Sequence, residues 1–142
     1  MIALRLVLDT NIVVSAALKP DGVQRTVVSI AATKPAHLYI SQVIFSEYRE
    51  VLARPELKIR RALREQFLGL LWRRSRLVKP SRRLEITKDP GDNIFLECAE
   101  AARADYLVTG NTRHFPTYWR GTKVITSREF IELVTPHLHS GR

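Results

Sequence analysis

Short apolar runs alternate with longer stretches of helical periodicity along almost the whole chain. The apolar runs lie at 4–8, 36–41, 104–110 and 122–126, and the stretches between them carry apolar residues at helical spacing. Strands that alternate with helices favour βαβ units, whose strands run parallel. We therefore predict an α/β fold, a three-layer α/β/α sandwich around a central and mostly parallel sheet.

The expected helices have recognisable ends. They are predicted over 11–18, 23–32, 41–53, 59–71, 93–103 and 127–134. Ser41, Asp92 and Ser127 stand where N-caps belong, because their side-chain oxygens accept hydrogen bonds from the first turn. The "LEI" at 84–86 is expected to be a short strand or an extended link. The length favours one domain over 1–136, with a frayed tail at 137–142.

Composition bounds the environment in which the chain works. Its apolar runs are far shorter than the roughly 18 residues that a membrane span requires, so we expect no membrane segment. Asp9 interrupts the N-terminal apolar segment and no small-residue cleavage site follows it, so we expect no signal peptide. Cys98 is the single cysteine. It cannot form an intrachain disulfide, which fits a reducing cytoplasm, and we expect it to be inert core.

The chain is strongly basic, with a formal net charge of +9, and one segment carries the excess. Between residues 58 and 83 there are ten basic residues and one acidic residue, Glu65. Such a segment indicates a polyanion, an anionic membrane or an acidic partner chain. A solvated helix face that aids solubility is the simpler alternative. Trp72 lies in the segment, where it either stacks on a base or packs against a helix.

Acidic and amide side chains fall at comparable places in the predicted fold. Asp9 ends the first strand, and Asn111 follows the "YLVTG" strand. Asp92 opens a helix after a turn, and Glu47 lies in the helix after the second strand. Open α/β folds keep their sites at the carboxyl ends of parallel strands. Capping and turn formation are the simpler explanations for Asp9, Asp92 and Asp89.

Glu47 is the residue that capping does not explain. Its neighbours at i−4 and i+4 are Val43 and Val51, so we expect its carboxylate to share their face and point toward the core. A buried carboxylate is costly unless a cation or hydrogen bonds satisfy it. Several carboxylates at one sheet edge repel each other unless a divalent cation offsets the charge, and hard oxygen ligands suit Mg²⁺ or Mn²⁺. Zinc is not expected, because no Cys/His pair has the spacing of a zinc site.

Four segments together resemble the PIN-domain family, the fold of the VapC-like toxins of toxin–antitoxin pairs. They are "VLDTNIVVSA" at 7–16, "ISQVIFSEYREVL" at 40–52, "DPGDNIFLECAEAARADYLVTGN" at 89–111 and "RHFP" at 113–116. These segments occur in the family's order and spacing and span nearly the whole chain. The resemblance implies a metal-dependent ribonuclease with a parallel sheet flanked by helices.

The resemblance also implies roles for individual residues. It carries over Asp9, Glu47 and Asp92 as the acidic ligands that hold Mg²⁺ or Mn²⁺, directly or through waters. Asn11 and Ser41 are implied to support the site by hydrogen bonding. The bound metal would activate a water for in-line attack on the phosphodiester.

Asn111 stands where the family usually has a fourth acid. An amide can offer a carbonyl oxygen but supplies no charge, which argues against tight binding of a second metal. The alternative function is therefore a catalytically weak or inactive PIN-fold module that binds RNA or a partner. Asp89, near the rim, is expected to order a metal-bound water. A phosphatase of the haloacid dehalogenase type is disfavoured, because it would need an acid where Asn11 stands.

Basic residues must attract the substrate, because an acidic pocket repels RNA phosphates. The expected RNA-binding residues are Arg60, Arg61, Arg64, Arg73, Arg74, Arg76, Arg113 and His114. His114 is alternatively a general acid or a plain loop residue. The resemblance implies a cognate antitoxin as partner and a homodimer. The apolar stripe over 59–71, formed by Ile59, Ala62, Leu63, Phe67, Leu70 and Leu71, is expected to be core or homodimer surface rather than the antitoxin site.

Overall fold

A computed structural model describes residues 3–140 of the chain. Its strands are β1 (Arg5–Leu8), β2 (His37–Ile40), β3 (Ser75–Leu77), β4 (Tyr106–Val108), β5 (Tyr118–Trp119) and β6 (Thr122–Ile125). Its α-helices are α1 (Thr10–Leu18), α2 (Val23–Ala31), α3 (Gln42–Leu52), α4 (Arg61–Arg74), α5 (Pro90–Ala102) and α6 (Ser127–Ser140). Two 3₁₀ turns, η1 (Pro55–Leu57) and η2 (Thr112–His114), complete the secondary structure.

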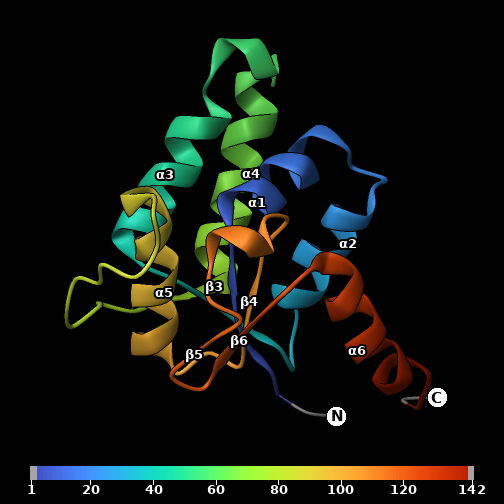
Figure 1. Cartoon of the computed structure of the whole chain (residues 1–142). Helices are drawn as coiled ribbons and strands as arrows, with labels where there is room; N and C mark the ends of the chain where they lie inside the picture. The colour runs from blue at the N-terminus through green and yellow to red at the C-terminus, as the bar shows by residue number, and fades with distance from the viewer. Residues whose placement is uncertain (1–2, 141–142) are drawn as a thin grey trace.

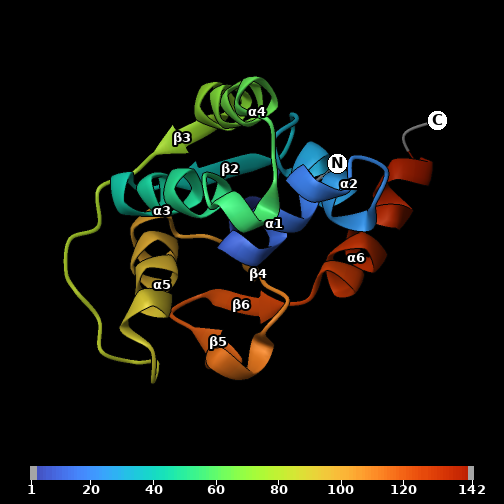
Figure 2. The same ribbon diagram turned by 90° about the horizontal axis from the view of Figure 1, so that it is seen from above.

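The strands form one six-stranded sheet in the order β3-β2-β1-β4-β6-β5. Every neighbouring pair is parallel except β5 and β6, which form an antiparallel hairpin. In Figure 2 the sheet separates α5 on one side from α2 and α6 on the other, while α4 lies at the β3 end. The predicted α/β/α sandwich with a mostly parallel sheet is therefore confirmed.

The core fills the space between the sheet and its helices. The central strands β1, β2 and β4 bury both faces, which explains why β1 reads as a continuous apolar run rather than an alternating one. Cys98 is fully buried in this core, and burial raises the pKa of its thiol to about 12. The prediction that Cys98 belongs to the core is confirmed, and its burial disfavours the reactive thiolate.

Two predicted helix caps are wrong. Asp89, not Asp92, caps α5: its Oδ1 accepts a hydrogen bond from the Gly91 amide at 2.9 Å. Pro90 begins the helix because its φ suits the first turn and it has no amide hydrogen to satisfy. Thr126 caps α6, because its hydroxyl accepts from the Glu129 amide while Glu129 Oε1 accepts from the Thr126 amide, a reciprocal capping box.

The chain's C-terminal part differs from the predicted boundaries. α6 was expected to end near Val134, but it continues through Pro136 to Ser140. The expectation of a frayed tail thus falls partly on helical backbone, and residues 141–142 lie outside the described part of the chain. Within residues 3–140 there is no helix that is both long and apolar enough to cross a bilayer.

Short elements escaped prediction because they carry little pattern. β3 and β5 have three and two residues and are largely exposed, so neither shows a hydrophobic period. The turn between β5 and β6 places Arg120 at φ 46° and Gly121 at φ 92°, as a two-residue hairpin turn requires. The "LEI" segment is an extended link, tied to α5 where Glu97 Oε2 accepts from the Leu84 amide.

The apolar stripe of α4 is only partly core. Phe67 and Leu71 are buried, whereas Leu63 and Leu70 are 56% and 36% exposed. The residues of α4 that face inward are Phe67, Leu68 and Leu71. The predicted stripe is therefore partly in the core and partly on the surface. Trp72 packs its ring 4.9 Å from that of Phe45 on α3. This contact favours the packing explanation for Trp72 over base stacking.

Candidate active site

The candidate site lies where β1 and β4 reach the carboxyl edge of the sheet. β1 leads from the N-terminal side directly into α1, and Asp9 is the single residue between them (Figure 1). The Asp9 amide donates to the Val108 carbonyl at 3.0 Å, which fixes the residue against the end of β4. This is the position that a site on a parallel sheet requires.

Two threonines hold the buried Asp9 carboxylate. Its Oδ1 accepts from the Thr10 amide at 2.7 Å, and its Oδ2 accepts from the Thr109 hydroxyl at 2.6 Å. Asp9 therefore does cap α1, as the simpler explanation proposed. Burial nevertheless raises the pKa of Asp9 to about 6, with smaller contributions from the charges of Asp92 and Glu47, while the two hydrogen bonds act in the opposite direction. Capping alone does not account for a carboxylate buried at this cost.

Glu47 does not point into the core. Its i−4 neighbour Val43 is 58% exposed, because α3 buries the line of Ile44, Tyr48 and Leu52 instead. Glu47 lies half-buried on the margin of the helix, where its Oε2 accepts a short hydrogen bond from the Thr10 hydroxyl. The predicted burial is therefore wrong, but the carboxylate does face the end of the sheet where Asp9 lies.

Asp92 occupies the first turn of α5, once the cap is assigned to Asp89. Its side chain is 17% exposed, and its Oδ2 lies 3.5 Å from His114 Nδ1. Burial and the nearby charge of Asp89 raise the pKa of the Asp92 carboxyl, and His114 counteracts them. Asp89 itself is exposed, which fits the rim position expected for it.

The predicted supporting residues hold the backbone around the site. The Asn11 side-chain oxygen accepts from the Gly110 amide at 3.2 Å, which links α1 to the segment after β4. The Ser41 hydroxyl accepts from the Ile44 amide at 3.2 Å, which caps the helix that carries Glu47. Asn111 is exposed at the start of η2, on the same edge as Asp9.

Thr10, Thr109 and Tyr48 are the site residues that sequence reasoning missed. Thr109 donates to Asp9 and accepts from the Asn111 amide at 3.0 Å, so it joins two candidate site positions. Tyr48 is fully buried and donates its hydroxyl to the Leu8 carbonyl at 2.5 Å, directly before Asp9. The available signal was a threonine next to the acid in "LDTN" and another at the end of "YLVT".

The basic residues divide into groups that lie at different ends of the molecule. Arg73 and Arg74 end α4, which runs directly into β3, and Arg76 lies on β3 opposite Tyr39. β3 is an outermost strand of the sheet, two strands away from β1 and Asp9. Arg60, Arg61 and Arg64 lie at the opposite end of α4, which projects upward in Figure 1. Arg113 and His114 lie on η2 beside Asp92. These last two are the expected RNA-binding residues brought closest to the acidic site.

The acidic residues suit a hard divalent cation by their chemistry. Carboxylate oxygens are the donors that Mg²⁺ and Mn²⁺ prefer, and the mutual repulsion felt at Asp9 is what a cation would offset. Within the described residues, however, no three His, Cys, Asp or Glu side chains already form a compact ligand cluster. The donor set fits such a metal when waters complete the ligation, a mode that Mg²⁺ commonly uses.

Thr109→Val tests the hydrogen bond to Asp9. Valine keeps the shape of threonine but cannot donate, so the pKa of Asp9 should rise by on the order of one unit, the worth of one hydrogen bond to a charged group. Mn²⁺ binding, measured by calorimetry across pH, should then begin at a higher pH than in the wild-type protein. Thr112→Val, on η2, is the matched control and should leave the pH profile unchanged. An unaltered profile in Thr109→Val would show that this bond does not set the ionisation of Asp9.

The protein is therefore an α/β protein, and its candidate active site is a group of acidic residues at the carboxyl ends of β1 and β4. A family model described as "PIN domain" matches residues 5–113, and the chain belongs to the PIN domain family. The resemblance seen in the sequence motifs is thereby confirmed at the level of the family.

A solved structure supports the same fold. The crystal structure of VapBC2 from Rickettsia felis, bound to a DNA fragment from their promoter, contains a chain that matches with a TM-score of 0.59. The match has 19% sequence identity and covers 86% of this chain and 98% of that one. No curated protein matched the chain.

Proposed function

We propose that this protein is a metal-dependent endoribonuclease and the toxin of a toxin–antitoxin pair. The observation that carries the proposal is the buried Asp9 carboxylate, held by Thr10 and Thr109 and made costly by burial and by the charges of Asp92 and Glu47. Membership of the PIN domain family and the likeness to the VapBC2 structure support it. Cytoplasmic location and homodimer formation remain expectations from the sequence.

The proposed chemistry assigns each acid a task. Asp9, Glu47 and Asp92 would hold Mg²⁺ or Mn²⁺, directly or through waters, and Asp89 would orient a water at the rim. The bound metal would supply Lewis-acid activation of water and of the scissile phosphodiester. The chain itself orients Asp9 through the two threonines and Glu47 through the Thr10 hydroxyl, so these two carboxylates are held in place before a cation binds.

Substrate attraction is assigned to the arginines rather than to the acidic pocket. Arg60, Arg61 and Arg64 would contact phosphates in a sequence-independent and salt-sensitive way. The arginines near β3, which are Arg73, Arg74 and Arg76, would act by long-range attraction. Arg82, also in the basic segment, is engaged with both carboxylate oxygens of Glu100, at 2.6 and 2.9 Å, so it is not assigned this role.

The exposed Asn111 favours the alternative of a weakly active member of the fold. Replacing it with aspartate in Asn111→Asp restores a fourth carboxylate at this edge without changing side-chain size. Mn²⁺ affinity should rise by about tenfold, because ligand charge is a main determinant of affinity for such cations. Calorimetry measures the affinity and an RNA cleavage assay measures the activity. Unchanged affinity would mean that position 111 does not face the metal; Asn111→Gln is the uncharged control.

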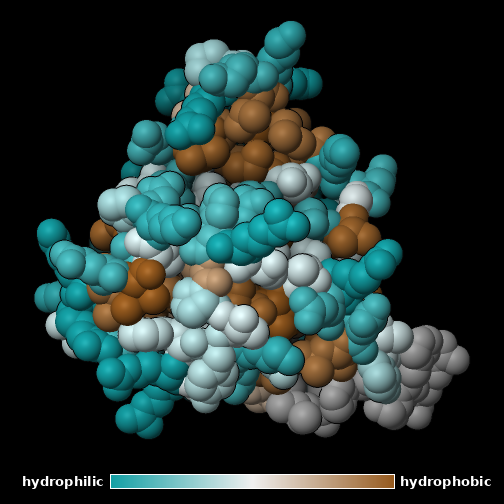
Figure 3. Space-filling view, viewed as in Figure 1, coloured by the Kyte–Doolittle hydropathy of each residue, from teal (hydrophilic) through white to brown (hydrophobic). Residues whose placement is uncertain are grey.

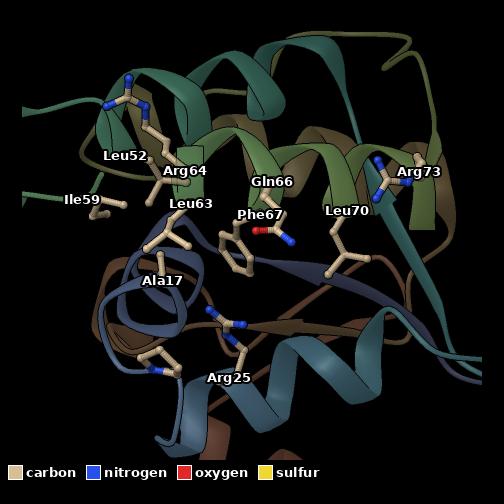
Figure 4. A pocket seen from close by; sticks show the side chains of 11 residues that line it. Ala17, Arg25, Leu52, Ile59, Leu63, Arg64, Gln66, Phe67, Leu70 and Arg73 are labelled. Carbon is tan, nitrogen blue, oxygen red and sulfur yellow. The ribbon is translucent and has the colours of Figure 1, made fainter. Parts of the chain in front are cut away.

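The antitoxin partner is proposed to occupy an apolar groove between α1 and α4. Figure 3 shows apolar side chains gathered over the upper part of α4, and Figure 4 shows the groove from close by. Its volume is about 320 Å³. It is lined by Ala17, Pro20, Leu52, Ile59, Leu63, Phe67 and Leu70, with Gln66 and the arginines Arg25, Arg64 and Arg73 among them.

The chemistry of the groove selects an amphipathic segment with acidic side chains. Leu63 and Leu70 offer exposed apolar surface, while Arg25 stacks its guanidinium 4.7 Å above the Phe67 ring and leaves positive charge at the rim. A partner that carries apolar residues flanked by acids would satisfy both features. The alternative from the sequence, that the exposed part of the 59–71 stripe is a homodimer surface, stays open.

Co-expression with the product of a neighbouring reading frame tests the partner. A stable complex that suppresses RNA cleavage is expected, and Leu63→Glu should weaken it by on the order of a hundredfold, because it places a charge in the apolar groove. Leu77→Glu, which alters a similarly exposed leucine on β3, is the matched control. A complex that tolerates Leu63→Glu as well as Leu77→Glu would place the partner elsewhere.

A further inference from the structure

A second cavity adjoins the acidic residues on the side of α5. Its volume is about 490 Å³. It is lined by Ile86, Thr87, Lys88, Asp89, Asp92, Arg113, His114, Phe115 and Pro116. Asp92 therefore belongs both to the candidate metal site and to the wall of this cavity. A ligand group in the cavity would be the immediate neighbour of whatever the acidic residues act on.

One wall of the cavity is tied to α5 by hydrogen bonds, and the other is the short turn η2, which is closed by its own backbone hydrogen bond. The buried Asn93 side-chain oxygen on α5 accepts from the amides of Ile86 and Thr87, at 3.1 and 2.9 Å, and from the Thr87 hydroxyl at 3.0 Å. The opposite wall is η2, where the His114 amide donates to the Asn111 carbonyl at 3.0 Å. The cavity is thus a feature of the folded chain that needs no rearrangement to form.

The lining combines two kinds of surface in a way that matches a nucleotide. Ile86, Phe115 and Pro116 offer apolar contact, and Phe115 is almost completely buried beneath it. Lys88 and Arg113 place positive charge around the same space, beside the carboxylates of Asp89 and Asp92. A nucleotide has the complementary division, with a flat apolar base at one end and an anionic phosphate at the other. The volume also lies within the range of sites for small ligands.

We propose that this cavity binds the nucleotide next to the scissile phosphate, with the base against Ile86 and Pro116 and the flanking phosphate against Arg113 and Lys88. The inference rests on the proposed ribonuclease function and adds to it a position for one nucleotide of the substrate. Asp92 and its contact with His114 form the boundary between this subsite and the acidic residues. Binding should therefore depend on the presence of a base in the cavity and only weakly on which base it is.

Binding without cleavage tests the subsite separately from the reaction. The full chain carrying Asp9→Asn is titrated in EDTA with a short labelled single-stranded RNA, and fluorescence anisotropy gives the affinity. Adding Arg113→Ala should weaken binding about tenfold, because it removes a phosphate contact. Arg76→Ala is the matched control, since it removes the same charge from β3, an outermost strand of the sheet, and should have a smaller effect. Equal losses from the two changes would overturn the subsite.

A second ligand tests the contact with the base. An abasic ribose-phosphate oligomer of the same length keeps the charge of the RNA but has nothing to place against Ile86. The protein should bind the RNA several-fold more tightly than the abasic oligomer, and Ile86→Asn should reduce that preference. Equal affinity for both ligands would overturn the proposal even if metal-dependent cleavage is observed. If the wild-type protein does not cleave RNA but still binds it more tightly than the abasic oligomer, the proposed function is contradicted and the nucleotide subsite is supported.

Discussion

Asp9→Asn is expected to reduce metal-dependent RNA cleavage by at least about a hundredfold while the protein stays folded. Asparagine has nearly the same shape and can still accept from the Thr10 amide, but it carries no charge at the most buried of the three acids. Loss of even an outer-shell partner of a metal commonly costs about ten- to a hundredfold in affinity or activity, and a direct ligand is worth more. Cleavage of a structured RNA in Mn²⁺ is the measurement.

Two further changes make the result specific to the acidic site. Glu47→Gln and Asp92→Asn should each reduce cleavage strongly, because both carboxylates are assigned to the same metal. Asp21→Asn makes the same chemical change at an exposed turn position and should cleave like the wild-type protein. Near-normal cleavage by Asp9→Asn, with circular dichroism showing both proteins folded, would remove Asp9 from the active site.

Asp9→Asn is also expected to stabilise the metal-free protein at about pH 8, by up to about 3 kcal/mol. In the folded chain the pKa of Asp9 is about 6, above the usual value of 3.8. As pH rises, the unfolded carboxyl therefore ionises first, and the folded state loses stability until its own carboxyl has ionised. The separation of about two pKa units corresponds to about 1.4 kcal/mol per unit. Asparagine does not ionise, so Asp9→Asn escapes this loss.

Denaturant unfolding of the two proteins across pH measures this effect. The stability difference should be small near pH 4, grow between about pH 4 and 6, and stay constant above that range. Mn²⁺ added at about pH 8 should stabilise the wild-type protein and leave Asp9→Asn unchanged, because only the wild-type site gains from binding. A difference that does not vary with pH, or a less stable Asp9→Asn protein at pH 8, would show that the charge of Asp9 is not destabilising.

The fold was largely readable from the sequence because its strongest elements are buried on both faces. The apolar runs of β1, β2 and β4 and the helical periods between them predicted the sandwich. β3 and β5 were not predicted, since each is too short and too exposed to display a period. The position of β3 follows from pairing with β2, which lies far back along the chain and which a local pattern does not contain. β5 pairs with the adjacent β6 in a tight hairpin and is simply too short to be recognised.

The candidate site was predicted in outline and corrected in detail. Asp9 and Asp92 were proposed from their places at a strand end and a helix start, and Glu47 from its position within a helix. The predicted burial of Glu47 was wrong because helical spacing does not say which line of α3 faces inward. The cap of α5 was misplaced because Pro90 makes Asp89 the better start. Thr109 was missed, since its role depends on a contact with Asp9 across 100 positions of the chain.

RNA cleavage by the wild-type protein after treatment with EDTA, followed by titration with Mn²⁺, decides whether the acidic site is a metal-dependent nuclease. Cleavage should be absent in EDTA and should return with Mn²⁺, in parallel with Mn²⁺ binding seen by calorimetry. Cleavage that persists in EDTA would contradict a metal-dependent site. Absence of both cleavage and Mn²⁺ binding in well-folded protein would contradict the nuclease itself and favour a PIN-fold module that binds RNA or a partner without cutting.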